Sequence, residues 1–215
     1  MAATKSPDIL SLYMDSVLEH EKYPLSVYKF CKTNEIEEQE FYKKYASLDT
    51  IKHLVWQVFF ENTMQVLHKN DGYAAMTRKD RLLTFYFTFF EVLLLNRSYV
   101  LFSLKGSESP MTAMGQLKHL RSSFKAFTTE LIEEGNDDKT LSLAKHPVGL
   151  FSEAAWSQLL FILKFWLDDT SPAFEKTDAA IEKSITVAFD VFDNTQLEAL
   201  VDLGKFLWKE KISKN

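Results

Sequence analysis

Apolar positions repeat at the spacing of an α-helix along most of the chain. A Ser-Pro-Asp sequence at residues 6–8, typical of a helix start, precedes apolar residues three to four apart and predicts a helix over residues 7–20. Tyr-Pro-Leu at residues 23–25 interrupts this pattern. Ser26 then caps a short second helix whose apolar positions face inward.

A tight link at residues 33–36 precedes a third short helix over about residues 37–45, and Ser47 caps a long fourth helix. Two short helices joined by a turn of three or four residues, with one helix before and a long one after, form the unit that presents a helix to DNA. The pattern therefore predicts a helix-turn-helix domain over residues 1–50.

The remaining residues, 51–215, are predicted to form a larger helical body. Five further helices are expected, at 77–104, 111–135, 152–168, 171–192 and 195–210. The chain has only 6 glycines and 5 prolines, where about 15 and about 11 would be average, so tight turns are few. We find no strand pattern, and the expected fold class is all-α.

Composition and charge narrow the class of protein. With 46% apolar and 26% charged residues, the chain is typical of folded globular proteins. Cys31 is the only cysteine, so no intrachain disulfide can form, and the N-terminus lacks a secretory pattern; we therefore expect a cytoplasmic protein. The most apolar stretch, residues 82–95, is too short for a membrane span, which takes about 20 residues. The net charge of −5 gives no general argument for nucleic-acid binding.

Residues 9–51 resemble the DNA-binding domain of the TetR family. Ser26-Val27 opens helix two, Ile36 fills the turn, and Phe41-Tyr42-Lys43-Lys44-Tyr45 occupies the family's leucine-tyrosine-basic-histidine-phenylalanine stretch, followed by the cap at Ser47 and Asp49. The resemblance implies a TetR-like all-α fold, with residues 51–215 as the ligand-binding and dimerisation domain. It also implies a homodimer that binds double-stranded DNA with helix three and releases it when an apolar small molecule enters the body.

The resemblance and the side-chain chemistry together give the DNA-contact candidates. They are Lys29, Lys32, Tyr42, Lys43 and Lys44 for phosphates, and Gln39 for a base edge. Phe41 and Tyr45 are expected in the core.

Two features oppose DNA binding. Glu35 stands where the family usually has a glycine in a left-handed turn. Residues 1–60 hold nine acidic residues against seven lysines, and phosphate neutralisation supplies most affinity for DNA. Retention of the helix-turn-helix as a structural module only is therefore the alternative.

Aromatic residues concentrate in the body, where residues 85–95 form a helix that is apolar on every face. Such a helix is buried all round or lines a cavity, and core packing is the alternative to a pocket. The predicted ligand-pocket residues are Phe85, Phe89, Phe90, Glu91, Leu94, Met111, Met114, Phe124 and Phe127.

The segment from Asp169 to Thr177 is similar to one in the lipid-binding accessory proteins of ubiquinone biosynthesis, which share a TetR-like fold. This second resemblance implies an alternative function, in which the body binds an isoprenoid lipid and the helix-turn-helix no longer serves DNA. The same residues also match an ordinary helix cap.

Apolar stripes on the two helices at 152–168 and 171–192 predict a homodimer interface. Its candidate residues are Leu159, Ile162, Leu163, Trp166, Ile181, Ile185 and Phe192. The monomeric alternative is that the helix at 195–210 covers these stripes. The histidines show no metal-ligand spacing and no nucleophile motif is present, so we expect neither a metal site nor an enzyme.

Overall fold

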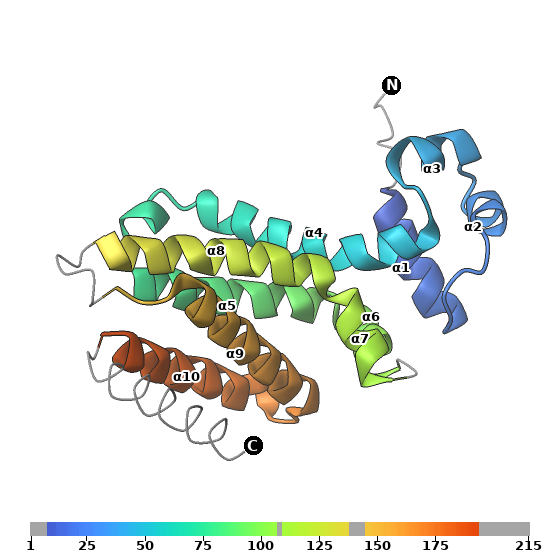
Figure 1. Ribbon diagram of the computed structural model, residues 1–215. Coiled ribbons are helices and arrows are strands. Elements are labelled where there is room, and N and C mark those ends of the chain that lie inside the picture. Colours follow the sequence, from blue (N-terminus) through green and yellow to red (C-terminus); the bar gives the residue numbers. More distant parts are fainter. Residues whose placement is uncertain (1–7, 107–108, 138–144, 194–215) are drawn as a thin grey trace, which may run out of the picture. The chain divides into compact units, whose positions relative to one another are not determined.

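The computed structural model describes residues 8–106, 109–137 and 145–193 (Figure 1). Within these ranges every regular element is a helix, which confirms the predicted all-α class. The contacts divide the chain into two compact units. We call residues 1–71 with 88–126 the head unit, and residues 72–87 with 127–215 the cavity unit. The predicted division at residue 50 does not coincide with this grouping, because helices beyond that residue pack with the helix-turn-helix.

The head unit contains the helix-turn-helix and the helices that pack against it. Its complete helices are α1 (Ile9–His20), α2 (Val27–Thr33), α3 (Glu38–Lys44), α4 (Leu48–His68), α6 (Arg97–Lys105) and α7 (Pro110–Gln116). The second half of α5 (Arg78–Leu95) and the first half of α8 (Lys118–Asp137) also belong to it.

Side-chain caps and a small aromatic core shape the start of the head unit. The Ser26 hydroxyl accepts the Lys29 amide at 3.3 Å and the Ser47 hydroxyl accepts the Thr50 amide at 3.1 Å, which confirms both predicted caps. The Phe30 ring contacts those of Tyr13 and Phe41, with centroids 6.2 and 6.1 Å apart. This cluster holds α1, α2 and α3 together.

Tyr23, in the link between α1 and α2, joins the helix-turn-helix to the rest of the head unit. Its hydroxyl donates to Gln116 Oε1 at 3.3 Å, and its ring lies 5.1 Å from that of Phe102 and 4.2 Å from the Lys52 ammonium. The Gln116 amide in turn donates to the carbonyl of Ser103 at 3.0 Å. The helix-turn-helix is therefore anchored to α4, α6 and α7.

The cavity unit is built from the ends of α5 and α8 and from two later helices. It contains the 3-10 helix η1 (Tyr73–Ala75), α9 (Val148–Asp168), the 3-10 helix η3 (Pro172–Phe174) and α10 (Glu175–Asp193). α9 and α10 lie side by side (Figure 1). The predicted helix at 195–210 lies outside the described residues.

Two predicted helices are each divided in the structure. The one expected at 77–104 consists of α5 and α6, bent by 90° at Asn96, whose side chain donates to the Val92 carbonyl at 2.8 Å. The one expected at 111–135 consists of α7 and α8, divided at Leu117. The predictions of single helices were wrong because the apolar periodicity of the sequence continues across each break, whereas the helical conformation of the backbone is interrupted there.

Candidate functional site

The turn of the helix-turn-helix has a defined backbone geometry. α2 ends at Thr33 and is followed by its C-cap residue Asn34, whose side chain donates to the Phe30 carbonyl at 2.8 Å. The Ile36 amide donates to the Cys31 carbonyl at 2.9 Å. Between them Glu35 has a φ of 56°, in the left-handed region. This is the pattern of a Schellman helix end, where glycine is the usual residue at the position of Glu35. The left-handed turn conformation expected from the family resemblance is therefore present, and Glu35 adopts it in place of glycine.

The six candidate DNA contacts are all exposed, on α2 and α3. Lys29 and Lys32 lie on α2, and Gln39, Tyr42, Lys43 and Lys44 lie on α3. By contrast, Phe41 is fully buried, as predicted from the sequence, and Tyr45 is half-buried. The candidate side chains therefore have access to an approaching duplex.

The exposed surface of α3 is acidic. Glu37, Glu38 and Glu40 are all exposed, and the Lys43 ammonium lies 2.7 Å from a Glu40 carboxylate oxygen. This hydrogen bond and the lysine charge lower the pKa of Glu40. One of the two lysines at the end of α3 is thus engaged with a neighbouring carboxylate, which opposes phosphate binding.

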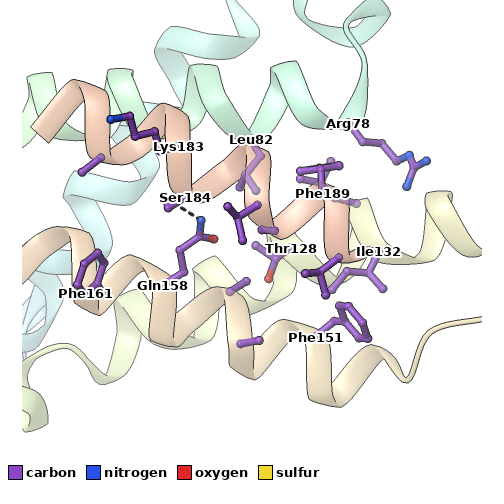
Figure 2. A pocket seen from close by; sticks show the side chains of 17 residues that line it. Arg78, Leu82, Thr128, Ile132, Phe151, Gln158, Phe161, Lys183, Ser184 and Phe189 are labelled. Atoms are coloured by element: carbon purple, nitrogen blue, oxygen red, sulfur yellow. Dashed lines mark hydrogen bonds between the residues drawn. The ribbon is translucent and has the colours of Figure 1, made fainter. Parts of the chain in front are cut away.

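The cavity unit contains an apolar cavity of about 580 Å³ that is partly open to solvent (Figure 2). This volume lies within the range of roughly 300–1,000 Å³ common for small-molecule pockets. The lining comes from four helices: Arg78 and Leu82 of α5; Thr128, Leu131 and Ile132 of α8; Phe151, Ala154, Ala155, Gln158 and Phe161 of α9; and Ala180, Lys183, Ser184, Val187, Ala188, Phe189 and Val191 of α10.

Few polar groups interrupt this lining. Gln158 Nε2 donates to Ser184 Oγ at 3.0 Å, which links α9 to α10 beside the cavity (Figure 2). Thr128 is buried in the wall. Among the described residues, the charged ones in the lining are Arg78 and Lys183, and none of the described lining residues is acidic. The cavity is therefore suited to a largely apolar ligand.

The residues predicted to form a pocket do not line this cavity. Five are buried aromatic residues, Phe85, Phe89, Phe90, Phe124 and Phe127, of which Phe85 and Phe127 are in ring contact at 5.0 Å. Glu91 and Met111 are exposed, as are Leu94 and Met114 to a lesser degree. The aromatic helix thus belongs to packed core where it is buried, which was the alternative interpretation of the sequence.

The sequence signal for the cavity is the alanines rather than the aromatics. Ala154 and Ala155 on α9, and Ala180 and Ala188 on α10, occupy positions where the two helices face the cavity. Since an alanine side chain ends at Cβ, these positions leave space that larger residues would fill. Small residues at helical spacing on two successive apolar helices could have drawn attention to this site.

The residues predicted for a dimer interface are buried within the single chain. Leu159, Ile162, Leu163, Trp166, Ile181 and Ile185 are each at most 3% exposed, so they face the core rather than a surface open to a second copy. The Phe192 side chain lies outside the described residues.

α9 and α10 also carry exposed apolar residues, and some of these belong to the cavity lining. These are Leu150, Phe161 and Phe165 on α9 and Val187 and Val191 on α10. By length and composition α9 could cross a membrane, as could α5 and α6 if a pair bent by 90° counted as one span. Core helices of soluble proteins meet the same criterion, so this observation has little weight.

The segment with a resemblance to lipid-binding proteins is a helix cap in the structure. The Asp169 carboxylate accepts the amides and hydroxyls of Ser171 and Thr177 at 2.7–3.0 Å, which fixes the path from α9 into α10. Burial raises the pKa of Asp169, but these hydrogen bonds outweigh it and the net pKa lies below the ordinary value. In the described part of the chain, no group of three potential metal ligands is found.

The chain is similar to known proteins both in sequence and in fold. A family model described as the C-terminal domain of tetracyclin repressor-like proteins matches residues 81–207, more than half of the chain. No curated protein matches the sequence.

Solved structures of similar fold cover nearly the whole chain. One is a protein of Syntrophomonas wolfei assigned to the TetR family of transcriptional regulators, with a TM-score of 0.64, 16% identity, and coverage of 87% of this chain and 94% of that one. Another, from Shewanella sp. PV-4 and assigned to the same family, has a TM-score of 0.54, 13% identity, and coverage of 86% and 93%. At these identities the likeness shows the shared fold.

Proposed function

Because the chain belongs to the TetR family of transcriptional regulators, we propose that it is a homodimeric regulator that binds double-stranded DNA and senses an apolar small molecule. The observation that carries the proposal is the cavity of about 580 Å³ in a chain that also presents the exposed α3 of a helix-turn-helix. A binding cavity and a DNA-reading helix are the two parts that a ligand-controlled regulator needs. We propose a cytoplasmic location and a regulatory rather than catalytic role.

A second copy provides a partner for the exposed apolar face of α9 and α10. Leu150 and Phe165 of α9 are exposed outside the cavity lining, and Phe161 and Val187, which belong to the lining, are each 60% exposed. Large apolar side chains grouped on neighbouring helices favour association, and a two-fold dimer is the commonest outcome for soluble proteins. A dimer also presents two α3 helices, as a palindromic operator requires.

DNA binding is tested with duplexes from the region beside the chain's own coding sequence. We expect a shift in fluorescence anisotropy that weakens steeply with salt, since phosphate contacts release counterions. Replacing Lys43 and Lys44 with glutamate should abolish the shift while the helical circular dichroism is unchanged. The matched control replaces two other exposed lysines, Lys69 and Lys176, with glutamate and should leave DNA binding intact. Unaltered binding by the Lys43 and Lys44 variant would exclude α3 as the reader.

A lipid-binding role without DNA contact is the second candidate, and the acidic surface of α3 favours it. Glu37, Glu38 and Glu40 repel phosphate, and Glu40 also holds Lys43. Native mass spectrometry of the gently purified protein distinguishes the two functions when combined with the anisotropy measurement. A retained lipid together with no DNA binding at low salt would support this candidate over the regulator.

A further inference from the structure

We propose that the cavity binds an apolar molecule with one hydrogen-bond donor, such as a hydroxyl group on a hydrocarbon chain, and that Gln158 Oε1 accepts this donor. The inference rests on the proposed ligand-sensing function and adds the class of ligand. It starts from the hydrogen bonds of two polar side chains beside the cavity, Gln158 of α9 and Ser184 of α10.

The hydrogen bonds of Ser184 determine which end of the Gln158 amide faces away from it. The Ser184 hydroxyl donates to the Ile181 carbonyl, 3.1 Å away in the same helix. A hydroxyl group has one proton to donate, so toward Gln158 it can only accept. The amide nitrogen of Gln158 is therefore the atom that lies 3.0 Å from Ser184 Oγ, and the amide oxygen points the other way.

Gln158 Oε1 is an acceptor without a partner in the part of the chain that the structure describes. It lies on the side of the amide away from Ser184, among the lining residues (Figure 2). In the free protein water can reach it, because the cavity is partly open to solvent. An apolar ligand displaces that water and leaves the oxygen unpaired unless the ligand itself supplies a donor. The cavity therefore favours a ligand with a donor at this position.

The position of Gln158 along α9 indicates how the ligand lies. α9 lines the cavity from Phe151 to Phe161, which at 1.5 Å per residue is a wall of about 15 Å. By the same rise, Gln158 is about 4.5 Å from the Phe161 end and about 10 Å from the Phe151 end. The longer part contains Ala154 and Ala155, whose small side chains leave space. The apolar part of the ligand should therefore extend from Gln158 toward Phe151.

Two isomers of equal size, 1-decanol and 1-methoxynonane, test the proposal. Each has one oxygen on a linear hydrocarbon chain, but only the alcohol can donate a hydrogen bond. Both are titrated into the full-length protein by calorimetry below their solubility limits, and the ratio of their dissociation constants measures the preference for the donor. The same ratio in Gln158→Met is the reference, because the hydration of the two probes is common to both proteins.

Gln158→Met should lower the preference for the alcohol roughly 2- to 12-fold, which corresponds to about 0.5–1.5 kcal/mol for one neutral hydrogen bond. The methionine side chain is of similar length, so the ether should bind at least as tightly as to the parent, which shows that the cavity is intact. The matched control Gln57→Met changes an amide of α4 that does not line the cavity, and it should leave the ratio unchanged.

Ser184→Ala tests the orientation of the amide by a different route. Without the Ser184 hydroxyl, the Gln158 amide can rotate and present its N–H to an ether oxygen. The preference should therefore fall because the ether binds more tightly, whereas in Gln158→Met it falls because the alcohol binds less tightly. A change in protein stability alone would not separate the two probes in this way.

The outcomes separate this inference from the function on which it rests. Equal ratios in the parent and in Gln158→Met, with both isomers bound, would overturn the hydrogen bond to Gln158 and leave an apolar ligand standing. If neither isomer binds to the parent, the inference fails together with a chain-like ligand. DNA binding, which is measured separately by anisotropy, then stands or fails on its own.

Discussion

Replacing Glu35 with glycine should stabilise the helix-turn-helix. Glu35 has a φ of 56° at the end of α2, and the bond from the Ile36 amide to the Cys31 carbonyl depends on that conformation. An L-residue in the left-handed region brings its Cβ close to the following carbonyl oxygen, and glycine has no Cβ to do so. The substitution thus relieves strain without altering a side-chain contact in the core.

The size of the effect follows from two opposing contributions. The left-handed conformation costs a non-glycine residue about 1–2 kcal/mol, and the greater freedom of glycine in the unfolded chain costs about 0.5–1 kcal/mol. The net gain in the free energy of unfolding is therefore about 0.5–1 kcal/mol. With a urea dependence of about 2 kcal/mol per molar, the unfolding midpoint should rise by roughly 0.3–0.5 M.

Glu35→Gln is the matched control, because it removes the charge and keeps the backbone strain. Urea unfolding followed by circular dichroism should show a higher midpoint for Glu35→Gly and little change for Glu35→Gln. Anisotropy with duplex DNA at low salt should show the same modest gain in affinity for both, since each removes one negative charge near α3. The two measurements thus separate the backbone effect from the charge effect.

Two results would refute this reasoning. Equal stabilisation by glutamine and glycine would mean that repulsion among the acidic residues, rather than the φ of Glu35, limits stability. Destabilisation by glycine would mean that the turn does not hold the left-handed conformation under strain.

Three further changes test the cap, the cavity and the dimer. Asp169→Asn should lower the urea midpoint at pH 7, because it removes a carboxylate that accepts four hydrogen bonds. These hydrogen bonds hold the pKa of Asp169 below its unfolded value of about 3.9, so the stabilisation is complete above that pH and is lost as the pH falls through the folded pKa. The difference in urea midpoint between the variant and the parent should therefore shrink in acid. Ala155→Phe should fill part of the cavity and abolish the ligand-induced rise in melting temperature, with the helical circular dichroism retained; an undiminished rise would place the ligand elsewhere. Phe165→Glu should reduce the light-scattering mass from a dimer to the 24.9 kDa of one chain, whereas its exposed neighbour in Lys164→Glu should leave the dimer intact; a parent protein that is already monomeric would contradict the dimer.

Local patterns in the sequence were enough to identify the helices of the helix-turn-helix and the family. Ser26 and Ser47 cap the helices that they were predicted to cap, and Phe41 is buried, as expected from its place in the helix-turn-helix. These features depend on residues within a turn or two of one another, so the sequence contains them directly. The left-handed turn at Glu35 follows from the same short-range geometry.

The cavity and the division of two helices were decided by tertiary structure. Periodicity reports that one side of a helix is apolar, but not which neighbour that side meets, so the stripe with Leu159 and Ile181 could face a partner or the chain's own core. The structure buries that stripe between α9 and α10, and leaves space beside Ala155 and Ala188, where small side chains from two helices meet. Space between helices depends on side chains far apart in the sequence, and for that reason the chain's pattern alone pointed to the aromatic helix instead.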